Sequence, residues 1–484
     1  MIARNRFRGA STVAAVLALV VSATLLTACT DTPPVSEDTA QSATPSSAYE
    51  VSRSEGAQRL LDALGPAIRD GDRRRLDPLI DPSASPSFRA TLTTAVDNLA
   101  PADTGRPSST AGQTGAPPAA GESDSAGERR GGRLRPRLLE YRLTPVQETE
   151  PLVPPEIQAR LDEQGSSDAW VAPVEIHHAL GGSAIPGIDE PEIVSTTTMI
   201  LARYGDDWKV VGDYRGDGAA PPPVQLWELP GVRAADVRTA GGASVIASYP
   251  DTADTVTRVR SLLPNAVDAV TEFWGDAWPR RAVVVATGDN DQFGALTRSL
   301  GSDVAAAAAA TVYADLDSAA RTVTGQRVVL TPAAGTLSAP ALGVVLRHEL
   351  THVAARTATA PGAPLWITEG VPEYVGRRGT YTRFADAAPQ LAARVRAGEA
   401  PTAFPTDADF AVDSEQATIA YQSAWSVAAF VADRFDETVL RRLYIGVAGT
   451  DDVGRQDAAI TNTLKMSRAQ LVERWRAWLT EQVR

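Results

Sequence analysis

The stretch Ala341-Leu-Gly-Val-Val-Leu-Arg-His-Glu-Leu-Thr-His-Val353 sets the pattern H-E-x-x-H within an apolar run. The apolar residues predict a buried helix, on which His348 and His352 stand four positions apart and hence on one face. Two neutral imidazoles one turn apart can bind a single zinc ion. Glu349 then lies beside the metal, where it would take a proton from a zinc-bound water.

The alternative is a pair of core histidines with a capping or solvated glutamate. The chain contains only 4 histidines, so a chance H-E-x-x-H is rare. Two imidazoles and a carboxylate are also costly in a hydrophobic helix unless they serve a purpose. The motif therefore predicts a metal site.

A second motif, Leu365-Trp-Ile-Thr-Glu-Gly-Val-Pro-Glu-Tyr374, follows a break of prolines and glycine at positions 361–364. The break lets a new helix start and return antiparallel, with Glu369 and Glu373 on one face. A catalytic zinc takes three protein ligands and keeps an open position. We expect Glu369 to be the third ligand and Glu373 to accept from the other nitrogen of a ligating histidine. The alternative is a solvated pair in an amphipathic helix.

Together, H-E-x-x-H and W-x-x-E-G-x-x-E-Y resemble the gluzincin zinc metallopeptidases, the clan of thermolysin and the leukotriene hydrolase/aminopeptidase family. The similarity covers residues 225–484 and is strongest over 343–376. The resemblance implies that His348, His352 and Glu369 bind zinc and that Glu349 is the general base. No histidine follows His352, which excludes the third-histidine site of metzincins.

Two further features bear on the kind of peptidase. The aminopeptidase branch carries a G-x-M-E-N loop before the zinc helix, where this chain has Gly335-Thr-Leu-Ser-Ala-Pro340. The departure favours an endopeptidase. By the same resemblance, Tyr421 matches the tyrosine that stabilises the transition state, with Tyr374 and Tyr381 as weaker candidates. The alternative for Tyr421 is a core tyrosine packed beside Trp425.

The N-terminus combines arginines at positions 4, 6 and 8 with a short apolar run that ends Leu26-Thr-Ala-Cys29. This resembles a bacterial lipoprotein signal and implies removal of residues 1–28, acylation of Cys29 and anchoring on the outer face of the cell membrane. Two or more acyl chains are enough for stable anchoring. The alternative is a simple cleaved signal with an incidental cysteine.

The charge balance is acidic, with 46 Lys and Arg against 59 Asp and Glu and a net charge of −13. This argues against nucleic acid and against electrostatic binding to anionic lipid. A peptide or protein substrate is the expected partner, and the sequence leaves the oligomeric state open.

The predicted fold class is α+β, in two domains. A polar tether at 29–52 precedes an accessory domain at 53–217, with a Gly/Ser/Pro-rich insertion at 101–130 that is typical of disorder. Residues 53–80 are expected to be helical with a break near Gly65-Pro66, and strands are expected at 138–143, 170–178, 194–204 and 208–214. Helices first and then antiparallel strands resemble the nuclear-transport-factor-2-like cone. His177 and His178 fall in a strand, on opposite faces, and cannot chelate one ion together. A linker at 218–224 leads to the metallopeptidase domain at 225–484. This domain is expected to contain a small sheet with strands at 243–248, 282–286, 311–314 and 327–330, followed by the zinc helix and C-terminal helices.

The favoured function is a surface-anchored zinc metallopeptidase. Two alternatives stay open. One is a lipid-anchored binding or assembly module that retains a zinc-bound peptidase fold without proteolysis, although such a site has no use for Glu349. The other is a hydrolase of a non-peptide bond.

Overall fold

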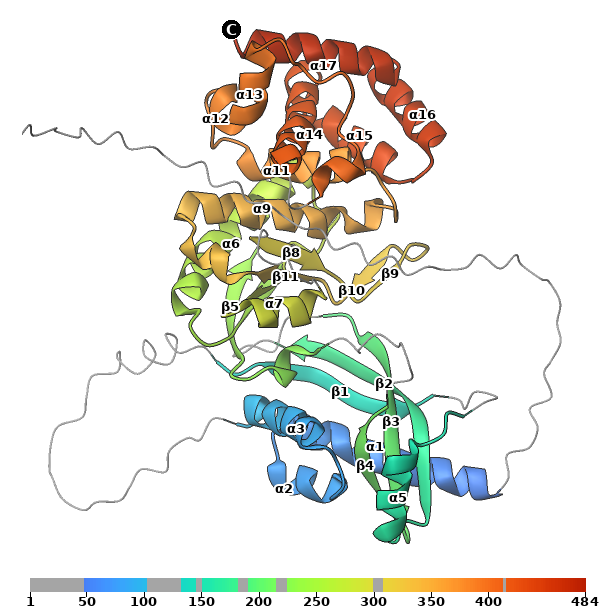
Figure 1. Ribbon diagram of the computed structural model, residues 1–484. Helices are drawn as coiled ribbons and strands as arrows, with labels where there is room; N and C mark the ends of the chain where they lie inside the picture. Colours follow the sequence, from blue (N-terminus) through green and yellow to red (C-terminus); the bar gives the residue numbers. More distant parts are fainter. Residues whose placement is uncertain are drawn as a thin grey trace, which may run out of the picture.

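The computed structural model describes residues 48–101, 132–144, 150–181, 190–214, 224–298, 308–411 and 415–484. The predicted signal, Cys29 and almost all of the predicted insertion and linker lie outside this part of the chain. The described residues form an α+β structure in three tiers: an N-terminal helix-and-sheet tier, a second sheet, and a group of C-terminal helices (Figure 1). No helix in the described part is long and apolar enough to span a membrane.

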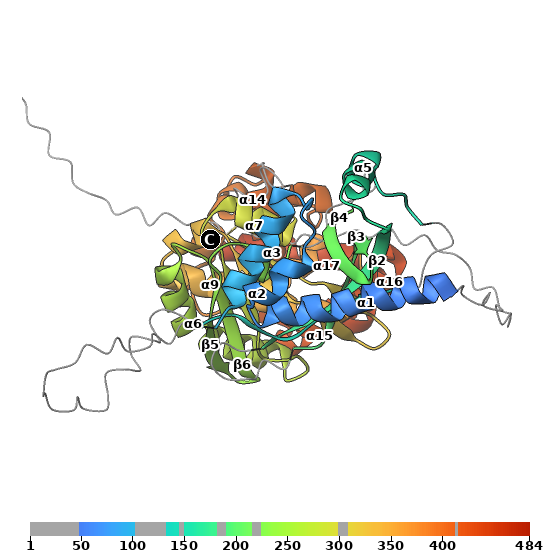
Figure 2. The same ribbon diagram turned by 90° about the horizontal axis from the view of Figure 1, so that it is seen from below.

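The N-terminal tier is a four-stranded antiparallel sheet of order β1-β2-β3-β4, covered by helices α1–α3 on one face (Figures 1 and 2). Helix α5 covers the other face through a small cluster around Leu161 and Val171. The elements are α1 (Ala48–Arg69), α2 (Arg73–Leu76), α3 (Pro86–Leu99), β1 (Arg135–Leu143), α5 (Pro155–Glu163), β2 (Asp168–Gly181), β3 (Ile193–Tyr204) and β4 (Asp207–Asp213).

Helix α1 corrects two sequence expectations. It begins at Ala48, so the last residues of the predicted tether are helical, and it runs unbroken through Gly65-Pro66, where a break was expected. A Cβ at Gly65 would lie 2.6 Å from the carbonyl oxygen of Leu139 on β1. Close packing on the sheet therefore overrides the local cost of glycine and proline in the helix.

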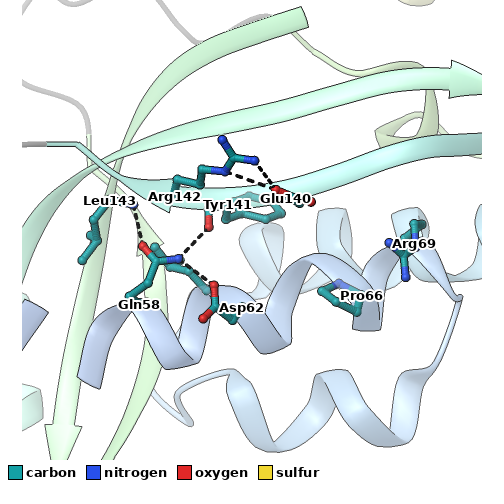
Figure 3. A pocket seen from close by; sticks show the side chains of 9 residues that line it. Gln58, Asp62, Pro66, Arg69, Glu140, Tyr141, Arg142 and Leu143 are labelled. Atoms are coloured by element: carbon teal, nitrogen blue, oxygen red, sulfur yellow. Dashed lines mark hydrogen bonds and ion pairs between the residues drawn. The ribbon is translucent and has the colours of Figure 1, made fainter. Parts of the chain in front are cut away.

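The groove between α1 and β1 has a volume of about 530 Å³ (Figure 3). Gln58 reaches across it as a short strand would: its amide donates to the carbonyl of Tyr141 and accepts from the N–H of Leu143. Glu140 and Arg142 at its rim pair with each other. Gln58 thus occupies the outer edge of β1 at Tyr141 and Leu143, where a further strand could not pair.

The second sheet has five strands in the order β5-β6-β7-β11-β8, with β8 at one edge. Strands β6, β7 and β11 are parallel, whereas β5 and β8 run antiparallel to their neighbours. Side chains alternate between the faces: Val284 packs under α6 and α9, and Val283 and Val285 face the N-terminal tier. The strands are β5 (Arg233–Thr239), β6 (Gly242–Ser248), β7 (Val283–Ala286), β8 (Ala309–Val312) and β11 (Arg327–Leu330).

Helices α6 (Ala253–Trp274) and α9 (Ala339–Ala355) pack side by side above this sheet, and α7 (Asn290–Thr297) lies below it (Figure 1). A hairpin of β9 (Asp315–Asp317) and β10 (Thr322–Thr324) projects beyond the edge strand β8. The third tier consists of α10 (Leu365–Thr368), α11 (Gly370–Arg377), α12 (Phe384–Ala387), α13 (Pro389–Arg396), α14 (Glu415–Arg434), α15 (Glu437–Ala448), α16 (Val453–Leu464) and α17 (Arg468–Gln482).

The first two tiers share one hydrophobic cluster, which joins Leu61 of α1 and Trp170 of β2 to Trp227 and Val285. Polar contacts reinforce it. The side-chain amide of Asn98 donates to the carbonyls of Trp227 and Leu229. The buried carboxylate of Glu190 pairs with Arg327 of β11 and accepts from the N–H of Leu180.

The two adjacent histidines of β2 have different neighbours, as their positions in a strand predict. His177 lies between the carboxylates of Glu175 and Glu192. His178 packs edge-on against Trp227, with ring centroids 5.3 Å apart, and neither histidine shares a metal cluster in the described chain. Burial lowers the pKa of His178 to about 4, and the nearby Arg327 guanidinium acts in the same direction.

We predict that His178 makes the folded chain acid-sensitive. Its folded-state pKa of about 4 lies below the ordinary value of 6.5, so its contribution is complete above pH 6.5 and is lost as the pH falls towards 4. The loss should be about 3 kcal/mol at most. Urea unfolding at pH 7.5 and pH 5 should show a smaller pH dependence in His178→Gln than in the wild type. If the free energy of unfolding changed equally with pH in both proteins, the pKa of this imidazole would not differ between the folded and unfolded states.

Candidate metal centre

Helix α9 carries the H-E-x-x-H motif into the centre of the molecule. Ser338 caps its first turn by accepting from the N–H of Ala341, and Pro340 occupies a position where no N–H is needed. His348 and Glu349 are 1% and 0% exposed, and the side chain of His352 is 13% exposed. The motif therefore lies in the buried setting that the sequence predicts, with His352 closest to solvent.

The three predicted ligands converge. Nε2 of His348 lies 3.0 Å from Nε2 of His352 and 3.3 Å from Oε2 of Glu369, and the distance from His352 to that oxygen is 3.7 Å. A tetrahedral zinc ion with bonds of ~2.05 Å separates its ligand atoms by about 3.3 Å. These are the only three His, Cys, Asp or Glu residues of the described chain that meet in this way. The cluster can hold a metal ion.

Two glycines bring Glu369 to the histidines. Glu369 joins α10 to α11 with helical backbone angles, and its carbonyl accepts from the N–H of Glu373. A Cβ at Gly370 would lie 2.5 Å from the carbonyl oxygen of Ala424 on α14. A Cβ at Gly376 would lie 3.0 Å from a carbonyl of α9. The E-G-x-x-E-Y-x-G spacing thus lets α11 fit tightly between α9 and α14.

The charges of the cluster support one another. Burial by itself raises the pKa of Glu369, but His352 and His348 outweigh it and hold the pKa well below its usual range. For His348, burial acts to lower the pKa, and the contacts with Glu369 and Glu373 raise it overall. A buried carboxylate that stays ionised and two imidazoles together form a set of ligands that suits a divalent cation.

A second layer of contacts orients His348. Its Nδ1 lies 3.5 Å from Oε1 of Glu373, and Oε2 of Glu373 lies 2.5 Å from Arg377. Arg377 also donates to the carbonyl of Ala387, and both charged side chains are buried. Glu373 therefore lies beside His348, one of the two histidines that it is expected to contact. The sequence analysis missed Arg377, although its i+4 spacing from Glu373 is the signal that could have found it.

The side chain of Glu349 contacts the edge strand β8. Its Oε2 accepts a 2.5 Å hydrogen bond from Thr311 of β8, and its Oε1 is buried with no hydrogen-bond partner among the described residues. Burial raises the pKa of Glu349, with the two histidines acting against this shift. A carboxylate with one oxygen fixed and the other uncommitted has a site ready for a proton or a water.

The three candidate tyrosines differ in their burial and in their contacts. Tyr421 is 4% exposed on α14, and its ring packs edge-on against Phe410 at 5.0 Å. Burial raises the pKa of Tyr421, and the charges of Glu369, Glu373 and Glu349 act in the same direction. Tyr374 instead donates to Glu437, and Tyr381 is 43% exposed. Trp425, the expected ring partner of Tyr421, packs on Phe384.

The stretch from Gly335 to Pro340 forms part of a short 3₁₀ helix (Pro332–Thr336) and the start of α9. Arg258 of α6 donates to the carbonyls of Gly335 and Leu337. These contacts fix the loop before α9 to the neighbouring helix. The side chain on the sheet edge that reaches Glu349 is Thr311, which comes earlier in the chain and which the sequence analysis placed only in a strand.

Comparison with family models and with curated protein sequences finds no match. Among solved structures, a glutamate-to-alanine mutant of a two-domain M1 zinc metallopeptidase bound to L-arginine is similar at a TM-score of 0.30 and 12% identity, over 65% of this chain and 61% of that chain. An M1 zinc metallopeptidase from Deinococcus radiodurans has a TM-score of 0.28 and 12% identity, over 66% and 62%. This chain thus covers less than two thirds of either, and scores this low assign neither family nor activity.

We predict that Gly370→Ala weakens metal binding about 10- to 100-fold, the usual range when support around a ligand is disturbed. The added methyl group meets the backbone of α14 and must displace Glu369. Gly343→Ala on α9 is the matched control, because its nearest neighbour would be a flexible arginine tip at 4.0 Å. Competition with a chromophoric chelator measures both affinities. Equal values would mean that Glu369 does not depend on this close packing.

Proposed function

We propose that this chain is a zinc metallopeptidase that hydrolyses peptide bonds, with His348, His352 and Glu369 as the metal ligands. The observation that carries the proposal is the convergence of these three side chains beside a buried Glu349. Two imidazole nitrogens and one carboxylate suit zinc better than magnesium or calcium, which prefer oxygen ligands. When bound, zinc would lower the pKa of a water molecule and polarise a substrate carbonyl.

Glu349 is the general base in this proposal. Thr311 holds one carboxylate oxygen, so the other, which has no hydrogen-bond partner among the described residues, would accept the proton of the attacking water. Burial raises the pKa of Glu349 from its ordinary value, towards the pH at which the protein would work, which suits a base that must also release its proton. A purely structural metal site has no need for such a residue.

Tyr421 and Glu373 complete the site. Tyr421 is a buried neutral donor on α14, the helix that packs against α11, and it is suited to hydrogen-bond the oxyanion that forms during attack. Glu373, held by Arg377, fixes the ring of His348 and so the direction of its Nε2. Each of these roles is performed by a side chain that the fold already holds in place.

We also propose that the protein acts at the outer face of the cell membrane, anchored through Cys29. The lipobox-like end of the N-terminal apolar run supports this location. Membrane fractionation of expressing cells would check it, and a chain recovered only in the soluble fraction would contradict it. The endopeptidase mode and the likeness of the first tier to the nuclear-transport-factor-2-like cone stay predictions.

The decisive experiment combines a peptide library with two variants. The wild type should cleave peptides, and a chelator should abolish cleavage. Glu349→Gln should reduce the rate about 10²- to 10⁴-fold and keep the metal, because the amide preserves the shape but cannot accept the proton. Glu369→Ala should instead lose metal affinity, which elemental analysis measures. A chain that binds zinc yet cleaves nothing would favour the non-proteolytic alternative.

A separate prediction concerns Tyr421. Tyr421→Phe removes only the hydroxyl, so the ring contact with Phe410 should survive. We expect kcat to fall about 10²-fold with unchanged zinc content and Tm, the usual scale for the loss of one oxyanion donor. Steady-state kinetics on the best library peptide gives the value. A change in kcat within about threefold would show that the hydroxyl makes no transition-state contact and that Tyr421 is only a core residue.

A further inference from the structure

Arg356 stands on the same face of the zinc helix as the two histidines. The spacing of His348, His352 and Arg356 is four residues each time, and the backbone of Arg356 keeps helical angles at the end of α9. Four residues of helix advance about 6 Å, so Arg356 lies about one turn beyond the metal cluster. This is the direction in which the buried face of α9 opens towards solvent, since His348 is buried and His352 and Arg356 are partly exposed.

The edge strand β8 runs beside this face. Thr311 belongs to β8, and Tyr313 follows directly after the last residue of that strand. The hydroxyl of Thr311 contacts Glu349, and the ring of Tyr313 lies under the guanidinium of Arg356, 5.0 Å from its centroid. Among the described residues β8 is an edge strand, so a peptide that extended along its outer edge would pass Glu349 and then Arg356.

The charge of Arg356 has no counter-ion in the described part of the chain. Its Nη2 donates to the carbonyl of Thr359, and its Nε is buried without an acceptor among the described residues. Stacking on Tyr313 fixes the cation, and a fixed arginine fork is the geometry that recognises carboxylates.

We propose that Arg356 binds a carboxylate of the peptide substrate, at a position within about two residues of the cleaved bond, given about 3.3 Å per extended residue. This inference rests on the proposed peptidase function and adds a substrate class to it. The carboxylate is either an acidic side chain or a free C-terminus. Arg356 is a specificity-determining residue, while the hydrolytic step belongs to Glu349.

The competing explanation is that Arg356 only stabilises the end of α9. A cation near a helix C-terminus interacts favourably with the helix dipole, and the bond to the carbonyl of Thr359 fits that role. Such a residue would affect folding and all substrates alike. The two explanations therefore differ in the ratio between substrates.

The experiment uses fluorogenic peptides in matched pairs. One series exchanges Glu for Gln at each of two positions on either side of the cleaved bond, and a second exchanges a free C-terminal carboxylate for an amide. For the wild type we expect kcat/KM to be about 10- to 100-fold higher for one carboxylate peptide than for its neutral match. Arg356→Gln should lose this ratio, Arg356→Glu should invert it in favour of the neutral peptide, and Arg356→Lys should keep part of it.

Arg474→Gln, an exposed arginine of α17, is the matched control and should keep the wild-type ratio. Zinc content and Tm of each variant separate a loss of recognition from a loss of folding. A wild type without any carboxylate preference, or a preference that persists in Arg356→Gln, would overturn the inference.

A binding measurement keeps the inference separate from the peptidase proposal. Fluorescence anisotropy with zinc-loaded Glu349→Gln reports binding of the same labelled pairs without turnover. Tighter binding of the carboxylate peptide that depends on Arg356 would support the inference even if the wild type cleaved nothing. No difference between the members of each pair would overturn it whatever the activity.

Discussion

The fit of α11 between α9 and α14 is the constraint on which the site depends. Two glycines permit it, one against the backbone of Ala424 and one against that of Val344. This packing gives Glu369 its place opposite the two histidines, and it brings Glu373 within reach of His348. A metal site with ligands from two helices is only as well defined as the distance between those helices, and here backbone contacts set that distance.

The local parts of the site were predictable from sequence because the helix period alone fixes them. His348, His352 and Glu349 follow from i+4 spacing in an apolar helix, and the i+4 pair of Glu369 and Glu373 follows the same rule. The contacts that cross between elements were not predictable in this way. Thr311 belongs to a strand 38 positions before Glu349, and no periodicity connects them.

The secondary structure was likewise predictable where local sequence patterns determine it and not where tertiary contacts do. The strands of both sheets and the helix over the metal motif were largely foreseen, since β-branched runs and apolar stripes mark them. The expected break at Gly65-Pro66 was wrong because glycine there serves contact with β1, which only the tertiary structure reveals. The edge strand was expected at 311–314 and lies at Ala309–Val312, a shift that alanine-rich sequence does not resolve.

The hydrophobic cluster shared by the first two tiers bears on how the chain can be divided. The Gly/Pro-rich linker marks the expected domain boundary in the sequence. Trp227 and Val285, which follow the linker, nevertheless pack in the same hydrophobic cluster as Leu61 and Trp170, which precede it. The part of the chain that follows the linker, cut free at that point, would present a broad apolar face to water, a surface prone to association. The N-terminal tier thus covers one face of the second sheet. The two parts of the chain that the linker separates in sequence therefore depend on each other for their stability.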